Sequence, residues 1–267
     1  MTTVPRPNAS VVSSSGLDQR VAIVTGAGSG IGRATAWVLA ENGFVIALVG
    51  RRRERLEAVA AEIAARGGSA LAVPADLSQA RAPWAVVDAV LEAHGRVDVI
   101  VNNAASFRLK LIEEFTLEDF DDLVAVNVRS PYFLVQAALP ALRTSPAAVV
   151  VNVSSAAAAM YRNGQTVYGL TKAALEHMTM NMAAELASDG IRVACVRPGP
   201  VRTEFHLVVP DAEERIRKLG TLVPLGRVGE PEELARWIWH LVDPDAAWVT
   251  GCIVTVDGGR ILGAPGA

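Results

Sequence analysis

Cysteine, charge and long apolar runs are all scarce in this chain. Only Cys195 and Cys252 occur among 267 residues, far apart and without metal-ligand spacing, which fits a reducing cytosol and predicts no metal site. No apolar run approaches the ~20 residues that a membrane-spanning helix needs. A net charge of −3 argues against a general nucleic-acid or membrane surface. These absences favour a soluble, cytoplasmic protein.

Hydrophobic residues, in contrast, are plentiful. They make up 51% of the chain, against 20% for charged residues, so a large core can be buried. Residues 1–17 contain two prolines and four serines. They have no apolar segment of the kind found in signal peptides, and we expect a flexible leader there. Residues 18–267 are expected to form a single domain.

Short apolar stretches rich in β-branched residues alternate with helical patterns. The predicted strands are Val21–Thr25, Phe44–Val49, Ala70–Pro74, Val97–Val101, Val149–Val153, Gly190–Val196 and Val249–Val256. This alternation predicts an α/β protein with one doubly wound parallel sheet, a Rossmann fold, and helices on both faces. Ligands of such sheets bind beyond the carboxyl ends of the strands.

A glycine-rich segment follows the first strand. It reads Gly26-Ala27-Gly28-Ser29-Gly30-Ile31-Gly32 and leads into a helical pattern that ends near Gly43. Glycines allow backbone to approach a pyrophosphate, and the N–H groups at a helix start can bind it. A glycine-rich turn without a ligand is the alternative. The order strand, glycine loop, helix favours phosphate binding.

Arginines stand where an NAD-binding fold carries an acidic residue, at the end of the second strand. The chain has Gly50 followed by Arg51–Arg53. A cation at a helix start costs roughly 0.3–1 kcal/mol unless an anion lies nearby. We therefore expect Arg51 to bind a 2′-phosphate, so that NADP(H) is favoured and NAD(H) is possible. Alternatively, the arginines are solvated and pair with Glu54 and Glu57.

Tyr168 and Lys172 are four residues apart in a helical pattern, so they share one face. A nearby ammonium is expected to lower the pKa of a tyrosine from its usual ~10. Ser155, after the fifth strand, could then polarise a substrate oxygen that Tyr168 protonates or deprotonates. The spacing alone is equally compatible with an exposed tyrosine and a solvated lysine.

Taken together, the motifs resemble those of the classical short-chain dehydrogenase/reductase family over about residues 18–262. The matching segments are Thr25–Gly32, Asp76–Leu77, Asn102–Ala105, Asn127, Ser154–Ser155, Tyr168–Lys172, Pro198–Thr203 and Val256–Gly259. Two positions depart from the family pattern. Ala105 and Ala194 stand where the family usually has glycine and often has asparagine, and we expect altered packing there.

The resemblance implies roles for particular residues. The catalytic group would be Asn127, Ser155, Tyr168 and Lys172, with Ser155 chosen over Ser154 because it lies thirteen residues before the tyrosine. Asn127 would position a water that relays protons to Lys172. The cofactor would contact Gly26, Ser29, Gly30, Ile31, Gly32, Arg51, Asp76, Leu77, Asn103, Ala104, Tyr168, Lys172, Pro198, Gly199, Val201 and Thr203. It also implies a homotetramer, or a homodimer, built on the apolar faces of Thr116–Leu142 and Gln165–Ala187.

The expected function is NADP(H)-dependent interconversion of a ketone and a secondary alcohol, with Tyr168 as general acid/base. Residues 203–221 are expected to form a mobile flap over the site. The expected pocket residues are Ser106, Phe107, Ala156, Tyr161, Gln165, Gly199, Phe205 and His206, which suit a neutral or weakly polar ketone. Arg108 and Lys110 leave room for an acidic tail, such as that of a carrier-bound 3-oxoacyl group. A non-catalytic nucleotide-binding sensor is the alternative; the complete catalytic group speaks against it.

Overall fold

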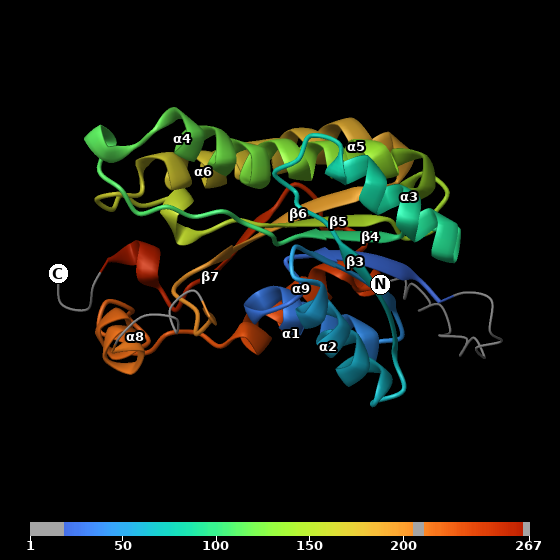
Figure 1. The fold of residues 1–267 in the computed structure, drawn as a ribbon, viewed down its shortest axis with the longest axis horizontal. Coiled ribbons are helices and arrows are strands. Elements are labelled where there is room, and N and C mark those ends of the chain that lie inside the picture. Colours follow the sequence, from blue (N-terminus) through green and yellow to red (C-terminus); the bar gives the residue numbers. More distant parts are fainter. Residues whose placement is uncertain (1–18, 205–210, 264–267) are drawn as a thin grey trace, which may run out of the picture.

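A seven-stranded parallel sheet runs through the centre of the protein (Figure 1), in the order β3-β2-β1-β4-β5-β6-β7. The structure, a computed structural model, describes residues 19–204 and 211–263, so the expected leader lies outside it. The strands are β1 Val21–Thr25, β2 Val45–Gly50, β3 Ser69–Pro74, β4 Val99–Asn102, β5 Val149–Val153, β6 Arg192–Pro198 and β7 Ile253–Val256. The predicted fold class is confirmed.

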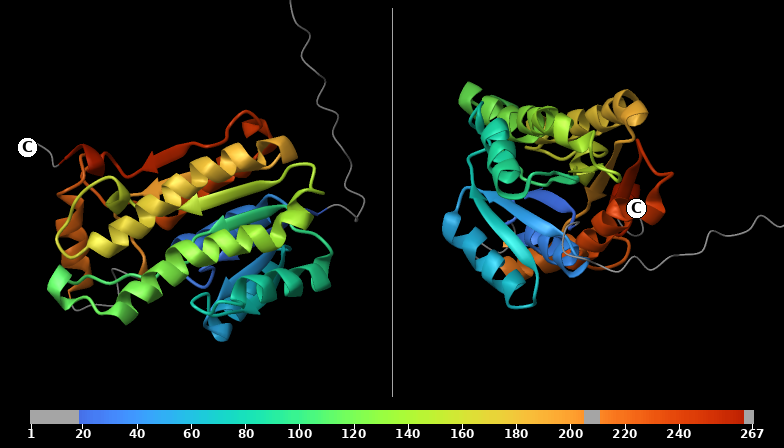
Figure 2. Two further views of the ribbon diagram at one scale, coloured as in Figure 1. Left: turned by 90° about the horizontal axis from the view of Figure 1, so that it is seen from above. Right: turned by 90° about the vertical axis from the view of Figure 1, so that its right-hand side faces the viewer.

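Two helical layers cover the sheet, one on each face (Figures 1 and 2). One layer contains α1 Gly30–Glu41, α2 Arg53–Ala64 and α9 Pro231–Val242, and the other α3 Ala82–His94, α4 Leu117–Val124, α5 Ser130–Leu142 and α6 Thr166–Leu186. In β1, Ala22 and Val24 pack into the first layer, whereas Val21 and Ile23 pack into the second. Because both faces are buried, the strands are continuously apolar rather than alternating.

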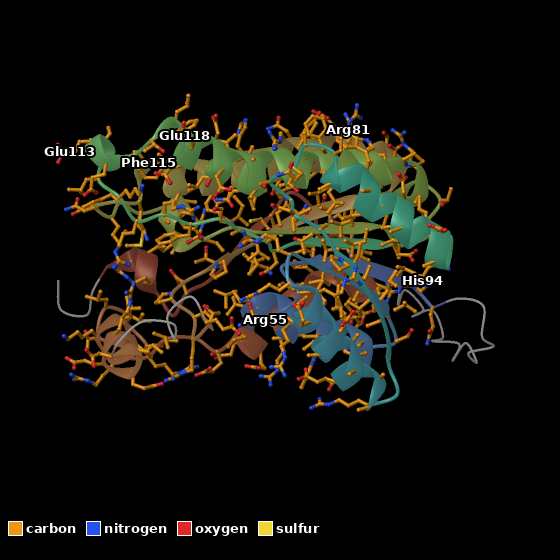
Figure 3. All side chains as sticks on the ribbon, in the orientation of Figure 1. Arg55, Arg81, His94, Glu113, Phe115 and Glu118 are labelled. Carbon is orange, nitrogen blue, oxygen red and sulfur yellow. The ribbon has the colours of Figure 1, made fainter. Side chains whose placement is uncertain are left out.

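The parallel strands bring their carboxyl ends to one edge of the sheet, and further elements lie beyond this edge. They are α8 Ala212–Gly220 and the short turn η6 Arg260–Leu262, both at the left of Figure 1. The expected flap therefore contains a regular helix, and its residues 205–210 lie outside the described residues. His94, expected to be structural, ends α3 at the opposite edge (Figure 3).

A π turn, Ala125–Arg129, separates α4 from α5 and contains Asn127. The N–H of Ser130 donates to the carbonyl of Ala125, five residues back. The segment from Leu117 to Leu142 is therefore not one regular α-helix that bends at Pro131. Pro131 lies in the first turn of α5, where a missing N–H is tolerated. The irregularity lies one turn earlier and places the Asn127 side chain in the interior.

Candidate functional site

Two adjoining cavities open at the carboxyl edge of the sheet. The active-site cavity, of ≈ 380 Å³, is lined by Ser155, Tyr168 and Lys172 among other residues. The adenosine-side cavity, of ≈ 210 Å³, is lined by Arg51, Asp76 and Leu77. Gly26, Ser29, Ala104 and Ala105 line both. Apart from Gly32, every residue expected to contact the cofactor therefore borders one continuous space.

The glycine loop between β1 and α1 leaves no room for side chains. A Cβ on Gly32 would lie 2.3 Å from the carbonyl oxygen of Gly26, and a Cβ on Gly26 would lie 2.8 Å from Nδ2 of Asn103. Gly26 and Gly30 also have φ values of 67° and 51°, which favour glycine. Although Gly32 lines neither cavity, it lets the loop close tightly. The loop thus brings bare backbone and the start of α1 to the cavity, as a dinucleotide pyrophosphate requires.

Thr25, whose role the sequence did not reveal, fixes this loop against the end of β4. Its hydroxyl accepts hydrogen bonds from the N–H groups of Asn103 and Ala104, at 2.9 and 3.0 Å. The side-chain amide of Asn103 in turn donates to the carbonyl of Thr25 at 2.8 Å. Asn103 borders the cavity as expected, but its N–H donors serve the protein. A polar residue at the end of an otherwise apolar strand could have indicated this role of Thr25 in the sequence.

The three arginines after β2 have different partners. Arg53 forms an ion pair with Glu57 at 3.6 Å, and Arg52 forms one with Glu204 at 3.7 Å. Within the described residues Arg51 has no ion-pair partner, and it lines the adenosine-side cavity. The expected alternative of pairing with glutamates therefore holds for Arg53, whereas Arg51 remains available to an anion.

Glu204 also binds Arg55, which lies in the first turn of α2 (Figure 3). This contact joins the segment after β6 to the helix that borders the adenosine-side cavity. Thr203 lies beside it, and its methyl group would be 3.0 Å from a Cβ on Gly30. The segment after β6 thus packs directly against the glycine loop.

Ser155, Tyr168 and Lys172 converge from β5 and α6. Ser155 and Tyr168 both line the cavity, and the Ser155 side chain is near enough to lower the pKa of the phenol. The Nζ of Lys172 lies 5.8 Å from the centre of the Tyr168 ring and donates to the carbonyl of Val153 at 2.9 Å. Phe107 packs edge-on against the Tyr168 ring, with 4.8 Å between ring centres. The three side chains are therefore held at the inner end of the cavity.

Burial, and not the neighbouring ammonium, sets the acidity of the tyrosine. It raises the pKa of Tyr168 to about 12, against a smaller lowering by the hydrogen bond to Ser155. Burial also lowers the pKa of Lys172 to about 8, opposed by the nearby Glu176 carboxylate. The expected lowering of the tyrosine pKa by Lys172 is thus wrong for the protein alone. The apolar surroundings disfavour the charged forms of both Tyr168 and Lys172. The ammonium group of Lys172 donates its hydrogen bond to the carbonyl of Val153.

Asn127 braces the site from the π turn. Its amide donates to the carbonyl of Ser106 at 2.9 Å and to the hydroxyl of Thr171 at 3.0 Å. Its Oδ1 accepts from the N–H of Ser106 at 2.8 Å. Because both N–H donors are used, a relay water could contact this side chain only through Oδ1. Asn127 itself does not line the active-site cavity.

A buried ionic network supports the site from below, and the sequence did not reveal it. Glu176, one turn after Lys172, receives hydrogen bonds from Arg197 at 2.6 and 2.7 Å and from Ser154 at 2.8 Å. The side chains of Arg197 and Glu176 are only 16% and 9% exposed. The signal was a glutamate on the inner face of α6, where an apolar residue is usual.

The expected pocket residues are only partly brought together. Phe107, Ala156, Gln165 and Gly199 line the active-site cavity. Ser106 borders the adenosine-side cavity instead, and Tyr161 is 93% exposed and lines neither. Phe205 and His206 lie outside the described residues. The cavity wall also contains residues that were not expected, namely Leu109, Met160, Arg162, Arg215, Leu219, Leu222 and Arg260.

Arg108 and Lys110 are not available to an acidic tail. Arg108 forms ion pairs with Asp122 at 3.2 Å and with Asp119 at 3.4 Å, and Lys110 also binds Asp119. Neither lines the cavity. The acids that neutralise them belong to α4, which folds back over this loop. Their expected role at the mouth is therefore wrong.

The tryptophans in the last part of the chain and the two positions that depart from the family pattern have different surroundings. Trp239 packs against Phe44 with 6.3 Å between ring centres, whereas Trp237 and Trp248 are exposed. Ala105 lines both cavities, and Ala194 is buried in β6. Across residues 19–204 and 211–263, no helix is both long and apolar enough to cross a bilayer.

Comparison with known proteins gives long matches. A family model described as enoyl-(acyl carrier protein) reductase matches residues 26–260. The chain is 36% identical to a 3-oxoacyl-[acyl-carrier-protein] reductase of Synechocystis sp. over 248 residues, covering 92% of this chain and 98% of that protein. It is 34% identical to a 7alpha-hydroxysteroid dehydrogenase of Clostridium sardiniense over 252 residues, covering 93% and 96%.

A solved structure agrees with these matches. The short-chain dehydrogenase/reductase of Serratia marcescens superposes with a TM-score of 0.86 at 36% identity, covering 92% of this chain and 99% of that one. The match to the family model spans strands β2 to β7 and every residue that lines the active-site and adenosine-side cavities. The protein therefore belongs to the classical short-chain dehydrogenase/reductase family and is an oxidoreductase that acts on CH–OH and ketone groups with a nicotinamide dinucleotide.

Proposed function

We propose that the protein interconverts a ketone and a secondary alcohol with NADP(H), using Tyr168 as general acid/base. The observation that carries the proposal is that Ser155, Tyr168 and Lys172 line the same cavity as the glycine loop. A substrate oxygen and a dinucleotide would use these two features side by side. When bound, the dinucleotide supplies or accepts the hydride.

The chain's own residues control the proton. In the reducing direction, the phenol of Tyr168 gives its proton to the carbonyl oxygen as hydride reaches the carbonyl carbon. Ser155 stabilises the charge that develops on that oxygen. A pKa of about 12 for Tyr168 keeps this proton in place at neutral pH, so the site is prepared as an acid. Lys172 holds the cofactor ribose, and Asn127 braces the Lys172 helix through Thr171.

The preference for NADP(H) rests on Arg51. Its guanidinium borders the adenosine-side cavity and forms no ion pair in the described parts of the chain, although its charge reaches the carboxylate of Asp76 in the same cavity. Strand β2 ends in Gly50 rather than in an acidic residue. A 2′-phosphate there would be attracted to Arg51, whereas an acidic residue would bind the 2′-hydroxyl of NAD. Use of NAD(H) at lower affinity is compatible with the same cavity.

A homotetramer fits the outer faces of the helices that were expected to form the interface. Large apolar side chains are exposed there on α4, α5 and α6, namely Leu117, Phe120, Tyr132, Leu170 and Met180. Exposed apolar surface on neighbouring helices is typical of subunit contacts. We therefore propose that these two helical segments carry the interface, with a homodimer as the alternative.

The direct test of the proposed chemistry is Tyr168→Phe. This variant keeps the ring against Phe107 and removes the proton donor, so turnover should fall roughly 10²- to 10⁴-fold. NADPH binding, followed by fluorescence, should change little. Suitable probe ketones are ethyl acetoacetate and the N-acetylcysteamine thioester of acetoacetate.

The matched control is Tyr161→Phe, which removes the same hydroxyl from a side chain that is 93% exposed and lines neither cavity. Its turnover should equal that of the wild type. Near-wild-type turnover by Tyr168→Phe on any ketone that the parent reduces would refute the mechanism. Tight NADPH binding without turnover of either probe by the wild type would favour a sensor.

A further inference from the structure

Three arginines that line the active-site cavity form no ion pair with an acidic side chain in the described parts of the chain. Arg162 precedes α6, Arg215 is on α8 and Arg260 is in η6, and all three line the cavity. No ion pair or side-chain hydrogen bond links any of them to another described residue. Glu204 is the one acidic side chain among the described residues that line this cavity, and it is bound to Arg55. The mouth thus carries uncompensated positive charge.

A further cavity of ≈ 430 Å³ adjoins this mouth on its outer side. It shares Arg162, Arg215, Leu219 and Leu222 with the active-site cavity, but it contains no residue of the glycine loop and none of the catalytic side chains. Arg162 and Arg215 therefore stand at the junction, on the side away from the expected cofactor. A ligand group in this outer cavity would belong to the substrate.

The charge balance of the outer cavity remains positive when its acids are counted. Lys218 and Glu214 bind each other at 2.8 Å, which leaves Asp211 as the remaining acid of its lining. The lining of the outer cavity then has Arg162 and Arg215 against Asp211, a net charge of about +1, and Arg260 adds a further positive charge in the adjoining active-site cavity. The carboxylate of Asp257, three residues before Arg260, accepts the N–H groups of Gly259 and Ile261 at 2.8 Å.

Apolar side chains separate this charge from the catalytic end. Leu109, Met160, Leu219 and Leu222 line the active-site cavity, and the last two continue into the outer cavity. The route from Tyr168 outward is thus an apolar passage followed by a cationic chamber. A small neutral ketone would leave the chamber unused. Three guanidinium groups suit phosphate or carboxylate oxygens, which they can bind through paired N–H donors.

We propose that Arg162, Arg215 and Arg260 form an anion-binding subsite for the end of the substrate that is remote from its carbonyl. The inference rests on the proposed function, because it names the substrate class of the same site: a ketone joined through an apolar segment to a phosphate or carboxylate group. It assigns to these three residues the role that the sequence had suggested for Arg108 and Lys110. The anion stays outside the cofactor space and fixes the orientation of the substrate.

The test compares ligand pairs that share the ketone and differ by an anionic group at the remote end. For phosphate, the pair is acetoacetyl-4′-phosphopantetheine and acetoacetyl-pantetheine, and for carboxylate it is 6-oxoheptanoate and its methyl ester. Dissociation constants are measured by calorimetry and turnover with NADPH separately. One charge-assisted contact is worth roughly a factor of 10, so the wild type should bind at least one anionic partner about 10-fold more tightly. Raising the salt concentration should reduce that preference.

The variants Arg162→Gln, Arg215→Gln and Arg260→Gln should each lose most of this preference, and Arg215→Lys should retain part of it. The matched control is Arg217→Gln, which removes the same charge from the same helix at a side chain that is 73% exposed. It should keep the wild-type preference. Which ligand pair shows the effect distinguishes a phosphate from a carboxylate.

Three results would overturn the inference. The wild type could show no preference in either pair, or the three glutamine variants could match Arg217→Gln. Alternatively, the variants could weaken NADPH binding and leave the ligand pairs unchanged, in which case the arginines serve the cofactor. Failure of the proposed function would give a different result. Calorimetry would still show tighter binding of the anionic ligand, but the wild type would turn over no ketone.

Discussion

The carboxyl ends of β1 and β5 border the same cavity, yet they are built in opposite ways. At β1 the wall consists of glycines and backbone, held by the hydroxyl of Thr25. At β5 the wall includes the buried polar side chains of Ser154 and Lys172, and the buried carboxylate of Glu176 lies behind them. A pyrophosphate needs close approach to backbone N–H groups. Proton transfer needs side chains whose charge is set by their surroundings.

The ion pairs near the two strands also differ in how deeply they are buried. Arg33 on α1 and Glu62 on α2 form a two-pronged pair at the surface, with side chains 43% and 39% exposed. Arg197 and Glu176 form a similar pair beneath the catalytic side chains, 16% and 9% exposed. Solvent screens the first and not the second. The same chemical contact is therefore expected to be dispensable near β1 and essential near β5.

The largest effect should come from breaking the buried pair. Glu176→Ala leaves the guanidinium of Arg197 buried without a counter-charge, which costs about 3 kcal/mol of unfolding free energy. The control Glu62→Ala should change that free energy by less than about 1 kcal/mol. Chemical denaturation of both variants measures the difference. Equal losses would mean that burial does not distinguish the two pairs.

The next largest effect should come from filling the glycine loop. In Gly32→Ala the new Cβ would lie 2.3 Å from the Gly26 carbonyl oxygen and 2.5 Å from Nδ2 of Asn103, so the loop must move. Such overpacking typically costs 1–3 kcal/mol, and NADPH binding should weaken roughly 10- to 100-fold.

Gly28→Ala serves as the control for the loop, because its Cβ would meet only the side chains of Arg55 and Leu56, at 3.2 and 3.6 Å. NADPH titration by fluorescence compares the two variants. If they bind NADPH equally well, close backbone approach at Gly32 is not what shapes the loop.

A smaller effect should appear in the pH dependence of stability. The pKa of Lys172 is lowered from 10.5 to about 8 in the folded protein, so the unfolded chain binds the proton more tightly between these values. The unfolding free energy of the wild type should therefore rise between pH 8 and 10.5 relative to Lys172→Met, by up to about 1.4 kcal/mol per pH unit.

Tyr168 should change the unfolding free energy in the opposite direction, between about pH 10 and pH 12. Its pKa is raised from 10.0 to about 12, so its contribution to stability should fall as the pH rises through that range, relative to Tyr168→Phe. Denaturation at several pH values tests both slopes. A flat difference between wild type and Lys172→Met would show that Lys172 is not desolvated.

The smallest effect should come from Arg51. Arg51→Ala removes an exposed charge from the adenosine-side cavity and should reduce the preference for NADPH over NADH about fivefold, as expected for an exposed ion pair. Arg53→Ala, whose side chain pairs with Glu57, should leave the ratio unchanged. Dissociation constants for both dinucleotides measure this. An unchanged ratio in Arg51→Ala would remove the basis for an NADP(H) preference.

Local patterns in the sequence predicted much of this architecture. The strands β1 and β5 have the bounds that the apolar stretches predicted. Glycine or polar residues follow each stretch and end the strand there. The juxtaposition of Ser155 with Tyr168 followed from parallel strands sharing one edge. The π turn at Asn127 did not follow, since no residue in it breaks a helix. The sequence also did not predict that Arg108 pairs with Asp119 and Asp122, because these contacts form only when α4 folds back over the loop that contains Arg108.

By itself, then, the sequence determined the order of the elements, the glycine loop and the spacing of the hydroxyl and amine groups, because each is a matter of neighbours along the chain. The tertiary structure alone decided which arginines are neutralised, which line the mouth of the cavity, and how acidic Tyr168 and Lys172 are. Burial and charge pairing depend on contacts between residues far apart in the chain, and these are fixed only when the layers pack together.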